Sequence, residues 1–395
     1  MEKYISIDKI VHTISKTHKF DKDKLYAINT SDVLEGEIIN TPLMEVAELK
    51  GQFKKTIEKG DILFSEIRPA NKRYAKVNIE DTKDYVVSTK LMVLRKYNND
   101  VDYDYFYYCL TNKWFLNILQ KRAENRICSF PQITFDLLSE YKFRIPQLSE
   151  QKRIAETLSL LDQKIALNTR MNEELEAMAK QLYDYWFVQF DFPDENGKPY
   201  KSSGGKMVYN PILKREIPAG WDVGSVSDYA KIFTGKKDVS KVTPGEYLFF
   251  SCAPDPIPSN EYIYDGELVL VSGNGSYTGR VSYYNGKCDL YQRTYGCALK
   301  NEFKDCFPWF YYYMKNYFQP LYTGGKHGSA IPYIVLSDLA DSIIVVNRET
   351  MHLFSNTIRS LFNYQFKNYY DTKLYLTHLR DSLLPMLMNG QVTVE

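Results

Sequence analysis

The chain has 395 residues, of which 44% are hydrophobic, so it is long enough to form two or more separately cored domains. Its 50 Lys and Arg residues balance 49 Asp and Glu residues, and the net charge of +1 neither indicates nor excludes a polyanionic partner. Any nucleic-acid site must therefore be a local patch of charge.

Residues 1–145 are predicted to form a β-rich block, with short alternating runs such as Tyr85 to Leu94. The stretch FSEIRPANKRYAK at 64–76 follows an apolar strand and carries candidate DNA contacts at Arg68, Asn71, Lys72 and Arg73. Arg can pair with guanine and Asn with adenine, while Lys favours phosphate. The alternative is a solvated hairpin tip.

An aromatic helix is predicted from DYFYYCLTN at 104–112 onward, and Trp114 and Phe115 beyond it are expected in the core. The stretch KRAENR, at a helix end, carries three further candidate DNA contacts, Lys121, Arg122 and Arg126. These cations complement the negative end of the helix dipole or contact phosphate; the alternative is that they have no role.

The longest predicted element is a central helix in residues 146–190, which include IPQLSEQKRIAETLSLLDQKIALNTRM. Ser149 is the expected N-cap, and a heptad pattern continues to Phe187, which makes the helix about 38 residues and about 57 Å long. Such a rod needs a partner of similar length, which residues 347–395 supply. The heptad core positions of the central helix are Ile154, Leu158, Leu161, Ile165, Asn168, Asn172, Leu175, Ala179, Leu182 and Trp186.

Residues 191–217 are predicted to be a turn-rich linker, and PAGW at 218–221 opens a second β-rich block over 218–346. Three of its stretches, TGKKD, QRTYG and GGKHGS, carry cations and other polar groups that suit DNA. The alternative for QRTYG is the rim of a strand. The candidates in these stretches are Lys236, Lys237, Gln292, Arg293, Tyr295, Lys326 and His327.

The two halves of the chain repeat one another. DYFYYCLTN at 104–112 matches PWFYYYMKN at 308–316, and KGDILFS at 59–65 resembles DGELVLV at 265–271. The matches occur in the same order in both halves, and the separations between matched residues change smoothly. This indicates one duplicated unit rather than a solenoid. Further matched pairs are Pro131 with Pro332, Ile133 with Ile334, Ile154 with Phe354, Leu158 with Ile358, Leu161 with Leu361, and Asn168 with Asn368.

Tandem copies of one unit predict two long helices that pack antiparallel. Asn168 and Asn368 lie near the middle of their helices. In an antiparallel pair the middle of one helix lies beside the middle of the other. We therefore expect these two residues, with Asn172, to fix the register of the helices at some cost in stability. The alternative is that the asparagines face solvent.

The chain resembles the specificity subunits of type I restriction-modification enzymes. The run IPQLSEQKRIAETLSLLDQKIALNTRMNEELEAMAKQLYDYWFVQFDFP is similar to their first central conserved region. HLRDSLLPMLMNGQV is similar to their C-terminal conserved region, and PAGW resembles the start of their second target-recognition domain.

The resemblance covers the whole length and implies a non-catalytic subunit. Its two recognition domains would each read half of an interrupted target in double-stranded DNA. Its helices would space these domains and dock two modification subunits and, through them, restriction subunits, with Trp186 and Phe187 as part of the docking surface. It also places Asn274, Ser276, Tyr277 and Arg280 in a hairpin that faces DNA. No cofactor is expected on this chain; S-adenosylmethionine, ATP and Mg are expected on the partners.

We therefore expect an α+β protein with two β-rich recognition domains held apart by two long antiparallel, coiled-coil-like helices, with approximate two-fold symmetry. The predicted segments are target-recognition domain 1 at 1–145, the central conserved helix at 146–190, the linker at 191–217, target-recognition domain 2 at 218–346, and the C-terminal conserved helix at 347–395.

Two other classes of function are weighed against this one. The stretch ELVLVSGNGSYTG at 267–279 has the glycines of a nucleotide or S-adenosylmethionine site, as in a DNA methyltransferase. That site needs a helix next, whereas RVSYYNGKCDLY alternates like a strand, which favours a β-hairpin. A coiled-coil scaffold explains the helices but not the two β-rich blocks.

The cysteines and the apolar segments predict the compartment. The six cysteines include no C-x-x-C pair and no histidine at ligand spacing, so we expect reduced thiols and no metal site. MEKYISIDKI lacks the apolar core of a signal peptide, and no apolar run approaches the roughly 18 residues of a membrane span. These features predict a cytoplasmic protein.

Overall fold

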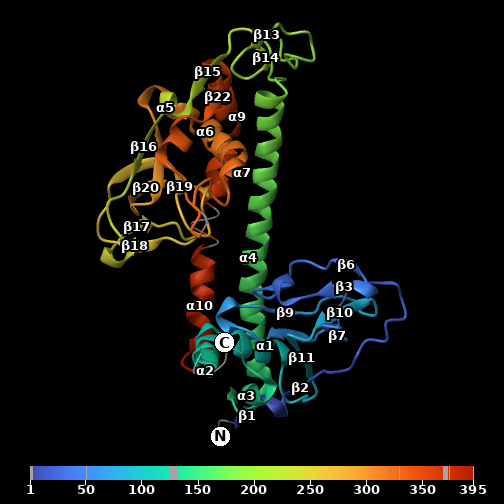
Figure 1. The fold of residues 1–395 in the computed structure, drawn as a ribbon. Coiled ribbons are helices and arrows are strands. Elements are labelled where there is room, and N and C mark those ends of the chain that lie inside the picture. Colours follow the sequence, from blue (N-terminus) through green and yellow to red (C-terminus); the bar gives the residue numbers. More distant parts are fainter. Residues whose placement is uncertain are drawn as a thin grey trace. The chain divides into compact units, whose positions relative to one another are not determined.

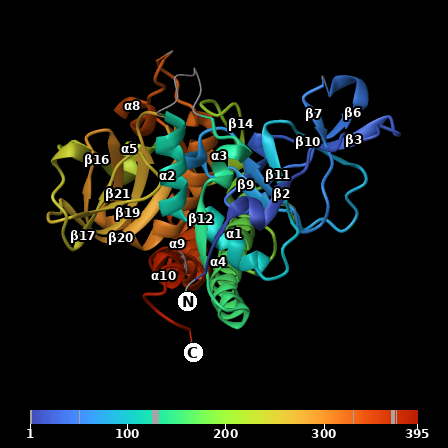
Figure 2. The same cartoon turned by 90° about the horizontal axis from the view of Figure 1, so that it is seen from below.

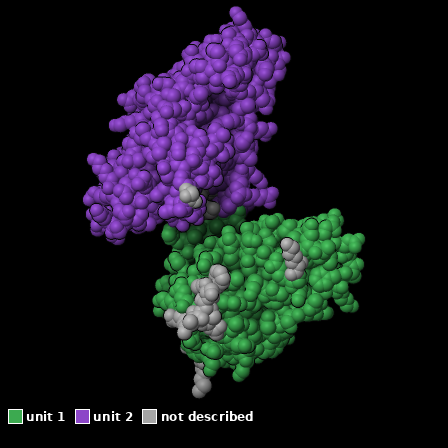
Figure 3. Space-filling model, viewed as in Figure 1, with its two compact units in different colours: residues 1–166, 374–395 green, residues 167–373 purple. Residues whose placement is uncertain are grey.

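The computed structural model of the chain describes residues 3–49, 51–124, 132–328, 330–367, 372 and 374–394. It divides into two compact units (Figure 3). Unit 1 contains residues 1–166 and 374–395, and unit 2 contains residues 167–373. The long helix α4 (Leu148–Tyr183) gives its first half to unit 1 and its second half to unit 2 (Figure 1).

Unit 1 is built on two four-stranded sheets with the strand orders β6-β3-β10-β7 and β2-β11-β8-β9. Two strand pairs, β1–β12 and β4–β5, complete it. Strand β8 has the sequence ILFS and is buried along its whole length. The strands are β1 (Lys3–Ser6), β2 (Val11–Thr13), β3 (Lys24–Ile28), β4 (Val33–Leu34), β5 (Glu37–Ile38), β6 (Leu43–Glu45), β7 (Phe53–Lys55), β8 (Ile62–Ser65), β9 (Tyr74–Lys76), β10 (Tyr85–Ser88), β11 (Leu91–Lys96) and β12 (Lys142–Ile145).

Helices cover the sheets of unit 1 and share a core with them. Asp102 caps the aromatic helix α1 by accepting hydrogen bonds from the backbone N–H groups of Asp104 and Tyr105. Side chains of α1, α2 and the first half of α4 form one buried cluster with the end of α10. The helices are α1 (Tyr103–Thr111), α2 (Lys113–Glu124), α3 (Phe135–Ser139) and α10 (Tyr375–Met388), with 3-10 turns at Ile7–Lys9, Thr30–Asp32, Val46–Glu48 and Pro69–Asn71.

Unit 2 is built on a six-stranded sheet with the order β16-β21-β19-β20-β17-β18, most of which is visible in Figure 2. The pairs β15–β22 and β13–β14 complete its β-structure. The strands are β13 (Met207–Asn210), β14 (Arg215–Pro218), β15 (Asp222–Ser225), β16 (Ala230–Thr234), β17 (Tyr247–Phe250), β18 (Ile257–Ser259), β19 (Tyr264–Ser272), β20 (Val281–Leu290), β21 (Thr294–Leu299) and β22 (Ile343–Val346).

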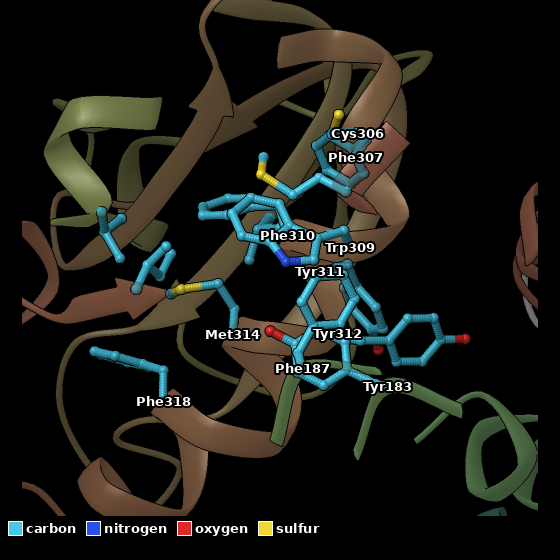
Figure 4. Close-up of a cluster of buried hydrophobic side chains, with 14 of the residues drawn as sticks. Tyr183, Phe187, Cys306, Phe307, Trp309, Phe310, Tyr311, Tyr312, Met314 and Phe318 are labelled. Carbon is cyan, nitrogen blue, oxygen red and sulfur yellow. The ribbon is translucent and has the colours of Figure 1, made fainter. Parts of the chain in front are cut away.

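Aromatic side chains dominate the core of unit 2. Helix α6 has the sequence FPWFYYY, and Trp309 and Phe310 on it are fully buried. Figure 4 shows Tyr183 and Phe187, from the end of the long helix, beside these rings. The helices are α5 (Val226–Tyr229), α6 (Phe307–Tyr313), α7 (Gln319–Tyr322), α8 (Leu336–Ala340) and α9 (Arg348–Lys367), with π-helical turns at Asp184–Val188 and Met314–Phe318 and 3-10 turns at Val239–Lys241 and Asn301–Cys306.

The two units share the order of their central strands, which confirms the predicted duplication, although unit 1 has two four-stranded sheets where unit 2 has one six-stranded sheet. The order β2-β11-β8-β9 of unit 1 recurs as β16-β21-β19-β20 in unit 2. Strand β3 is parallel to β10 and antiparallel to β6, just as β17 is parallel to β20 and antiparallel to β18. A short antiparallel pair precedes the long helix in both units, β1–β12 before α4 and β15–β22 before α9.

Long helices pack antiparallel within each unit, and the predicted α+β class is confirmed. In unit 1, the guanidinium of Arg380 on α10 binds Asp162 of α4 at 2.9 Å, while Gly390, after α10, lies against Arg144, before α4. In unit 2, the start of α9 meets the end of the long helix, where Phe354 packs on Tyr183 and Phe187. Each unit therefore combines the helix that follows its own sheets with the end of the other repeat's helix.

The structure corrects three sequence-based predictions. Trp186 and Phe187 do not form a docking surface, because they are 6% and 4% exposed within the aromatic core of unit 2. Trp114, expected in the core, is 66% exposed, whereas Phe115 beside it is buried. The segment predicted as a linker contains the hairpin β13–β14, and Ile217 of this hairpin belongs to the core of unit 2.

The central helix matches its predicted extent closely, beginning at Leu148 and continuing through the π-helical turn to Val188. Asn168 is 8% exposed, which argues against a solvent-facing role. Asn368 lies outside the described residues, so the pairing of the two asparagines stays a prediction. No helix in the described part of the chain is both long enough and apolar enough to cross a bilayer.

The aromatic contact between α9 and the long helix predicts a large loss of stability on truncation. Phe354 is fully buried, so Phe354→Ala should lower the free energy of unfolding by about 3 to 5 kcal/mol. The matched control is Leu353→Ala on the same helix, because Leu353 is 46% exposed and its truncation should cost less than about 0.5 kcal/mol. Chemical denaturation measures both, and similar losses would contradict this assignment.

Candidate nucleic-acid interface

Most of the predicted DNA contacts lie on three chain segments that meet in each unit, here called the junction. In unit 1 these are the β8–β9 turn (66–73), the β10–β11 turn (89–90) and residues 132–133. In unit 2 they are the β19–β20 turn (273–280), the β20–β21 turn (291–293) and the loop that leads to Ile334. Segments far apart in the sequence are thus brought together twice.

The same backbone hydrogen bonds hold both junctions. The N–H of Ser65 donates to the carbonyl of Arg73 at 2.8 Å, and the N–H of Ser272 donates to that of Arg280 at 3.0 Å. These bonds close the first turn of each junction, so residues 65–73 correspond to residues 272–280.

Two further bonds attach the other segments. Glu66 donates its N–H to Lys90 at 3.1 Å and accepts at its carbonyl from Ile133 at 2.8 Å. In unit 2, Gly273 donates to Arg293 at 2.8 Å and accepts from Ile334 at 2.9 Å. The junction is therefore defined by main-chain groups, which leaves its side chains free to differ.

The four candidates in the 66–73 turn fall into two groups. Arg68 and Asn71 are exposed, and their side chains have no polar partner within the described residues. Lys72 forms an ion pair with Glu35 at 3.0 Å. Arg73 donates from one nitrogen to the carbonyls of Ser31 and Val33, both at 3.1 Å, which gives it a structural role.

Helix α2 lies beside this turn, since the side chain of Gln120 accepts a hydrogen bond from the N–H of Ala70 at 3.1 Å. Lys121 is exposed next to it. Arg122 pairs with Glu140 at 3.1 Å and donates to the hydroxyl of Tyr141. Arg126 lies outside the described residues, so α2 offers Lys121 as its candidate contact.

The equivalent turn of unit 2 presents a different set of side chains. Ser276 and Tyr277 are exposed, and the guanidinium of Arg280 lies over the ring of Tyr277 at 5.5 Å. Arg280 also donates to the carbonyl of Ala253 at 2.7 Å. The side-chain oxygen of Asn274 accepts from the thiol of Cys252. This turn offers a hydroxyl and an aromatic ring where unit 1 offers a guanidinium and an amide.

The second segment of unit 2 carries exposed side chains at Gln292 and Arg293, which lack polar partners in the described chain. The hydroxyl of Tyr295 donates to the carbonyl of Ile334 at 3.2 Å and so stabilises the junction itself. The N–H of Gln292 donates to the carbonyl of Lys237 at 3.1 Å, which brings the TGKKD stretch alongside.

Within that stretch the two lysines differ. Lys236 is exposed, whereas Lys237 pairs with Glu261 and, at 3.5 Å, with the buried carboxylate of Asp289. These carboxylates raise the pKa of Lys237, with the Glu261 hydrogen bond as the largest cause. Lys237 is therefore structural, and Lys236 is the candidate contact.

The third segment of unit 2 contributes Lys326 and His327, which are both exposed. Lys326 lies 4.1 Å over the ring of Tyr322. His327 stacks on Tyr333 and approaches Asp338 at 3.2 Å. Both side chains are thus held against the protein but stay open to solvent.

Sequence reasoning missed Lys90 of unit 1, which is exposed and occupies the position of Arg293. The signal was present, because an alignment of the two repeats places one residue opposite the other. The turn that carries Lys90 is fixed by Lys55, whose amino group donates to the carbonyls of Thr89 at 3.0 Å and Leu91 at 2.7 Å. Burial lowers the pKa of Lys55.

The glycine-rich stretch at 267–279 is confirmed as part of a hairpin, because β19 is antiparallel to β20 over eight residue pairs from Tyr264–Cys288 to Val271–Val281. A nucleotide site of the predicted alternative type requires a helix after this turn. Among the residues that the structure describes, no three His, Cys, Asp or Glu side chains are grouped as metal ligands.

Residues 4–177 match the family model described as "Type I restriction modification DNA specificity domain". The HindI specificity subunit of Haemophilus influenzae is 28% identical, with 99% of each chain covered. The MjaIX specificity subunit of Methanocaldococcus jannaschii is 24% identical over 74% of this chain and 69% of its own. The type I restriction-modification S subunit of M. genitalium shares the fold, with a TM-score of 0.56 at 15% identity over 98% of this chain and 96% of its own.

Some cations at the junctions are bound by other protein groups and others are exposed. This difference predicts how much stability is lost when each is replaced by alanine. Arg73→Ala removes two hydrogen bonds from a charged donor to backbone carbonyls and should lower the free energy of unfolding by about 2 kcal/mol. The control, Lys90→Ala, should change it by less than about 0.5 kcal/mol. Equilibrium denaturation decides between them, and a larger loss for Lys90→Ala would overturn the assignment.

Proposed function

The chain belongs to the DNA specificity subunits of type I restriction-modification systems, and we propose that its two units each read one half of an interrupted DNA target. In such a system the specificity subunit is non-catalytic. S-adenosylmethionine and ATP belong to the modification and restriction subunits of the complex, which binds DNA.

The observation that carries the proposal is the double occurrence of one junction with different side chains. The backbone bonds at Glu66 and Gly273 are matched, yet the exposed groups around them differ. Bases are distinguished by the donors and acceptors that side chains present, whereas the scaffold sets their position. One scaffold with two sets of side chains suits two different half-targets.

The exposed groups fit the chemistry of a DNA groove. Arg68 and Asn71 in unit 1 can pair with guanine and adenine edges, respectively. Tyr277 in unit 2 offers a hydroxyl donor and an apolar ring. We assign phosphate contact to the cations that flank the turns, Lys90 and Arg293, because phosphate contacts position a protein without reading sequence.

We propose that the long helices space the two units and dock two modification subunits, which in turn recruit the restriction subunits. In support, α4 exposes Leu160, Leu167 and Met178 at 65%, 58% and 60%. In unit 2, a groove of about 570 Å³ between the long helix and α9 is lined by apolar side chains, including Leu182 and Leu361. Exposed apolar patches of this kind are typical of protein interfaces. The complex would act in the cytoplasm.

The predicted segments 1–145 and 218–346 remain our proposal for the two recognition domains, and 146–190 and 347–395 for the conserved helices. The packing of Ile217 in the core of unit 2 supports assigning the end of segment 191–217 to the second domain. The experiment that tests the function is co-expression of the chain with its modification subunits and mapping of methylated bases in the host DNA. Methylation at one interrupted sequence is expected, and methylation without sequence preference would refute the proposal.

Lys90 and Arg293 should contribute affinity without sequence preference. In the complex with the modification subunits, Lys90→Ala and Arg293→Ala should each lower the salt dependence of DNA binding, d log K/d log[salt], by about one unit. The methylated sequence should stay the same, because phosphate contacts carry no base information. Fluorescence anisotropy at several salt concentrations measures the slope, and a changed target sequence would show that these residues read bases.

The spacing role of the helices predicts a separable effect on the target. Four residues inserted into α4, and four into α9, should each add about 6 Å of helix. The gap between the half-targets should then lengthen by one or two base pairs while the half-targets remain as before. Methylation mapping of the double insertion checks this, and altered half-targets with an unchanged gap would contradict it.

A further inference from the structure

The two junction turns share an unusual backbone conformation. In unit 2 the turn has left-handed residues at Gly275 and Gly279, with φ of 82° and 84°. In unit 1 the equivalent positions, counted from the matched bonds at Ser65 and Ser272, are left-handed as well. Here, however, the residues are Arg68 and Lys72, with φ of 46° and 53°.

This conformation is costly for a residue with a side chain, because Cβ approaches the following carbonyl oxygen. Arg68 is further restricted because it precedes Pro69, whose ring disfavours helical conformations at the residue before it. Glycine would remove the cost at both positions.

Space does not explain the difference between the units at the first position. A Cβ added at Gly275 would meet no atom within 4 Å, so glycine is there for its backbone freedom alone. At Gly279, a Cβ would lie 2.3 Å from the carbonyl oxygen of Tyr322. The first position thus has room for a side chain in both units, and only unit 1 uses it.

Two of the other left-handed residues have their strain offset by contacts, whereas Lys214, in the β13–β14 turn, is exposed. Phe190 is 2% exposed and packs in the core of unit 2. Glu35 forms an ion pair with Lys72, and this one contact stabilises two left-handed residues. Arg68 has neither kind of compensation, since its side chain is exposed and no described residue binds it.

We propose that Arg68 is a specificity-determining residue, and that its guanidinium pairs with the edge of a guanine in the half-target read by unit 1. The inference rests on the proposed DNA-reading function and names one side chain that carries it. Strained backbone residues cluster at binding sites, where the strain holds a side chain in position for its ligand.

The surroundings of Arg68 favour base reading over a loose phosphate contact. Pro69 is buried, and the side chain of Gln120 accepts a hydrogen bond from the N–H of Ala70. The turn is therefore rigid before DNA arrives, as a bidentate pair with guanine requires. A phosphate contact needs only a mobile cation, which an unstrained lysine provides.

The test uses the full chain in complex with its modification subunits and three variants, Arg68→Gly, Arg68→Lys and Lys72→Gly. Arg68→Gly relieves the backbone strain and removes the guanidinium, so Tm should rise by about 2 to 6 °C. Preference for guanine at one position of one half-target should fall about 10-fold, and the other half-target should be unchanged. Selection from a pool of randomised duplexes measures the preference.

The other two variants separate the side chain from the turn. Arg68→Lys keeps the charge but loses the bidentate fork, and should show the same loss of guanine preference. Lys72→Gly relieves the backbone strain at the second left-handed position but keeps the guanidinium of Arg68, so it should leave the preference intact. Unchanged preference in Arg68→Gly or Arg68→Lys, a lower Tm for Arg68→Gly, or equal losses in Arg68→Gly and Lys72→Gly would each overturn the proposal. If the unaltered complex selected no sequence at all, the proposed function itself would fail.

Discussion

Both junctions depend on main-chain hydrogen bonds that join three distant segments. Glu66 and Gly273 each donate to a second segment and accept from a third, so main-chain bonds set the position of each turn, and side chains such as Lys55 and Tyr295 add to them. Buried backbone groups must be paired, and at Glu66 and Gly273 the partner is another backbone group. The side chains that make no structural contact can therefore differ, and two copies of one fold can present different chemistry.

The junctions are in turn supported by the packing of helices on sheets. The hydroxyl of Tyr108 on α1 donates to Asp162 of α4, and the hydroxyl of Tyr312 on α6 donates to Gln365 of α9. In both units the aromatic helix is thus tied to the long helix that follows, although the acceptors differ. Helix α4 begins in unit 1, and residues at its end belong to the core of unit 2; α10, from the second repeat, belongs to the core of unit 1. Duplication explains this exchange, because two equivalent surfaces are covered by two equivalent helix ends.

The sequence predicted what depends on periodicity and repetition. The duplicated order of elements, the long central helix and the hairpin at 267–279 all follow from patterns of apolar residues and from matched stretches. It did not predict which polar groups are free. Cations in the same loops and of the same residue types differ in whether they are bound. The bound ones are paired with distant segments that no local pattern reveals, and the exposed ones are not. The bound cations are Arg73, Arg122 and Lys237, and the exposed ones are Arg68, Lys121 and Lys236. The same limit applies to Trp114 and Trp186, since a heptad or an aromatic run indicates an apolar face without showing what covers it.

The backbone requirement of the turns also restricts what each unit can present. Gly279 has no room for a side chain beside Tyr322, so the second left-handed position of unit 2 is closed to any reading group. In unit 1 the equivalent residue is Lys72, which pairs with Glu35 beside the turn. Under the proposed function, the 273–280 turn of unit 2 would read bases with residues between its glycines, such as Ser276 and Tyr277. The two units differ in which turn positions can carry a base contact as well as in the side chains they use.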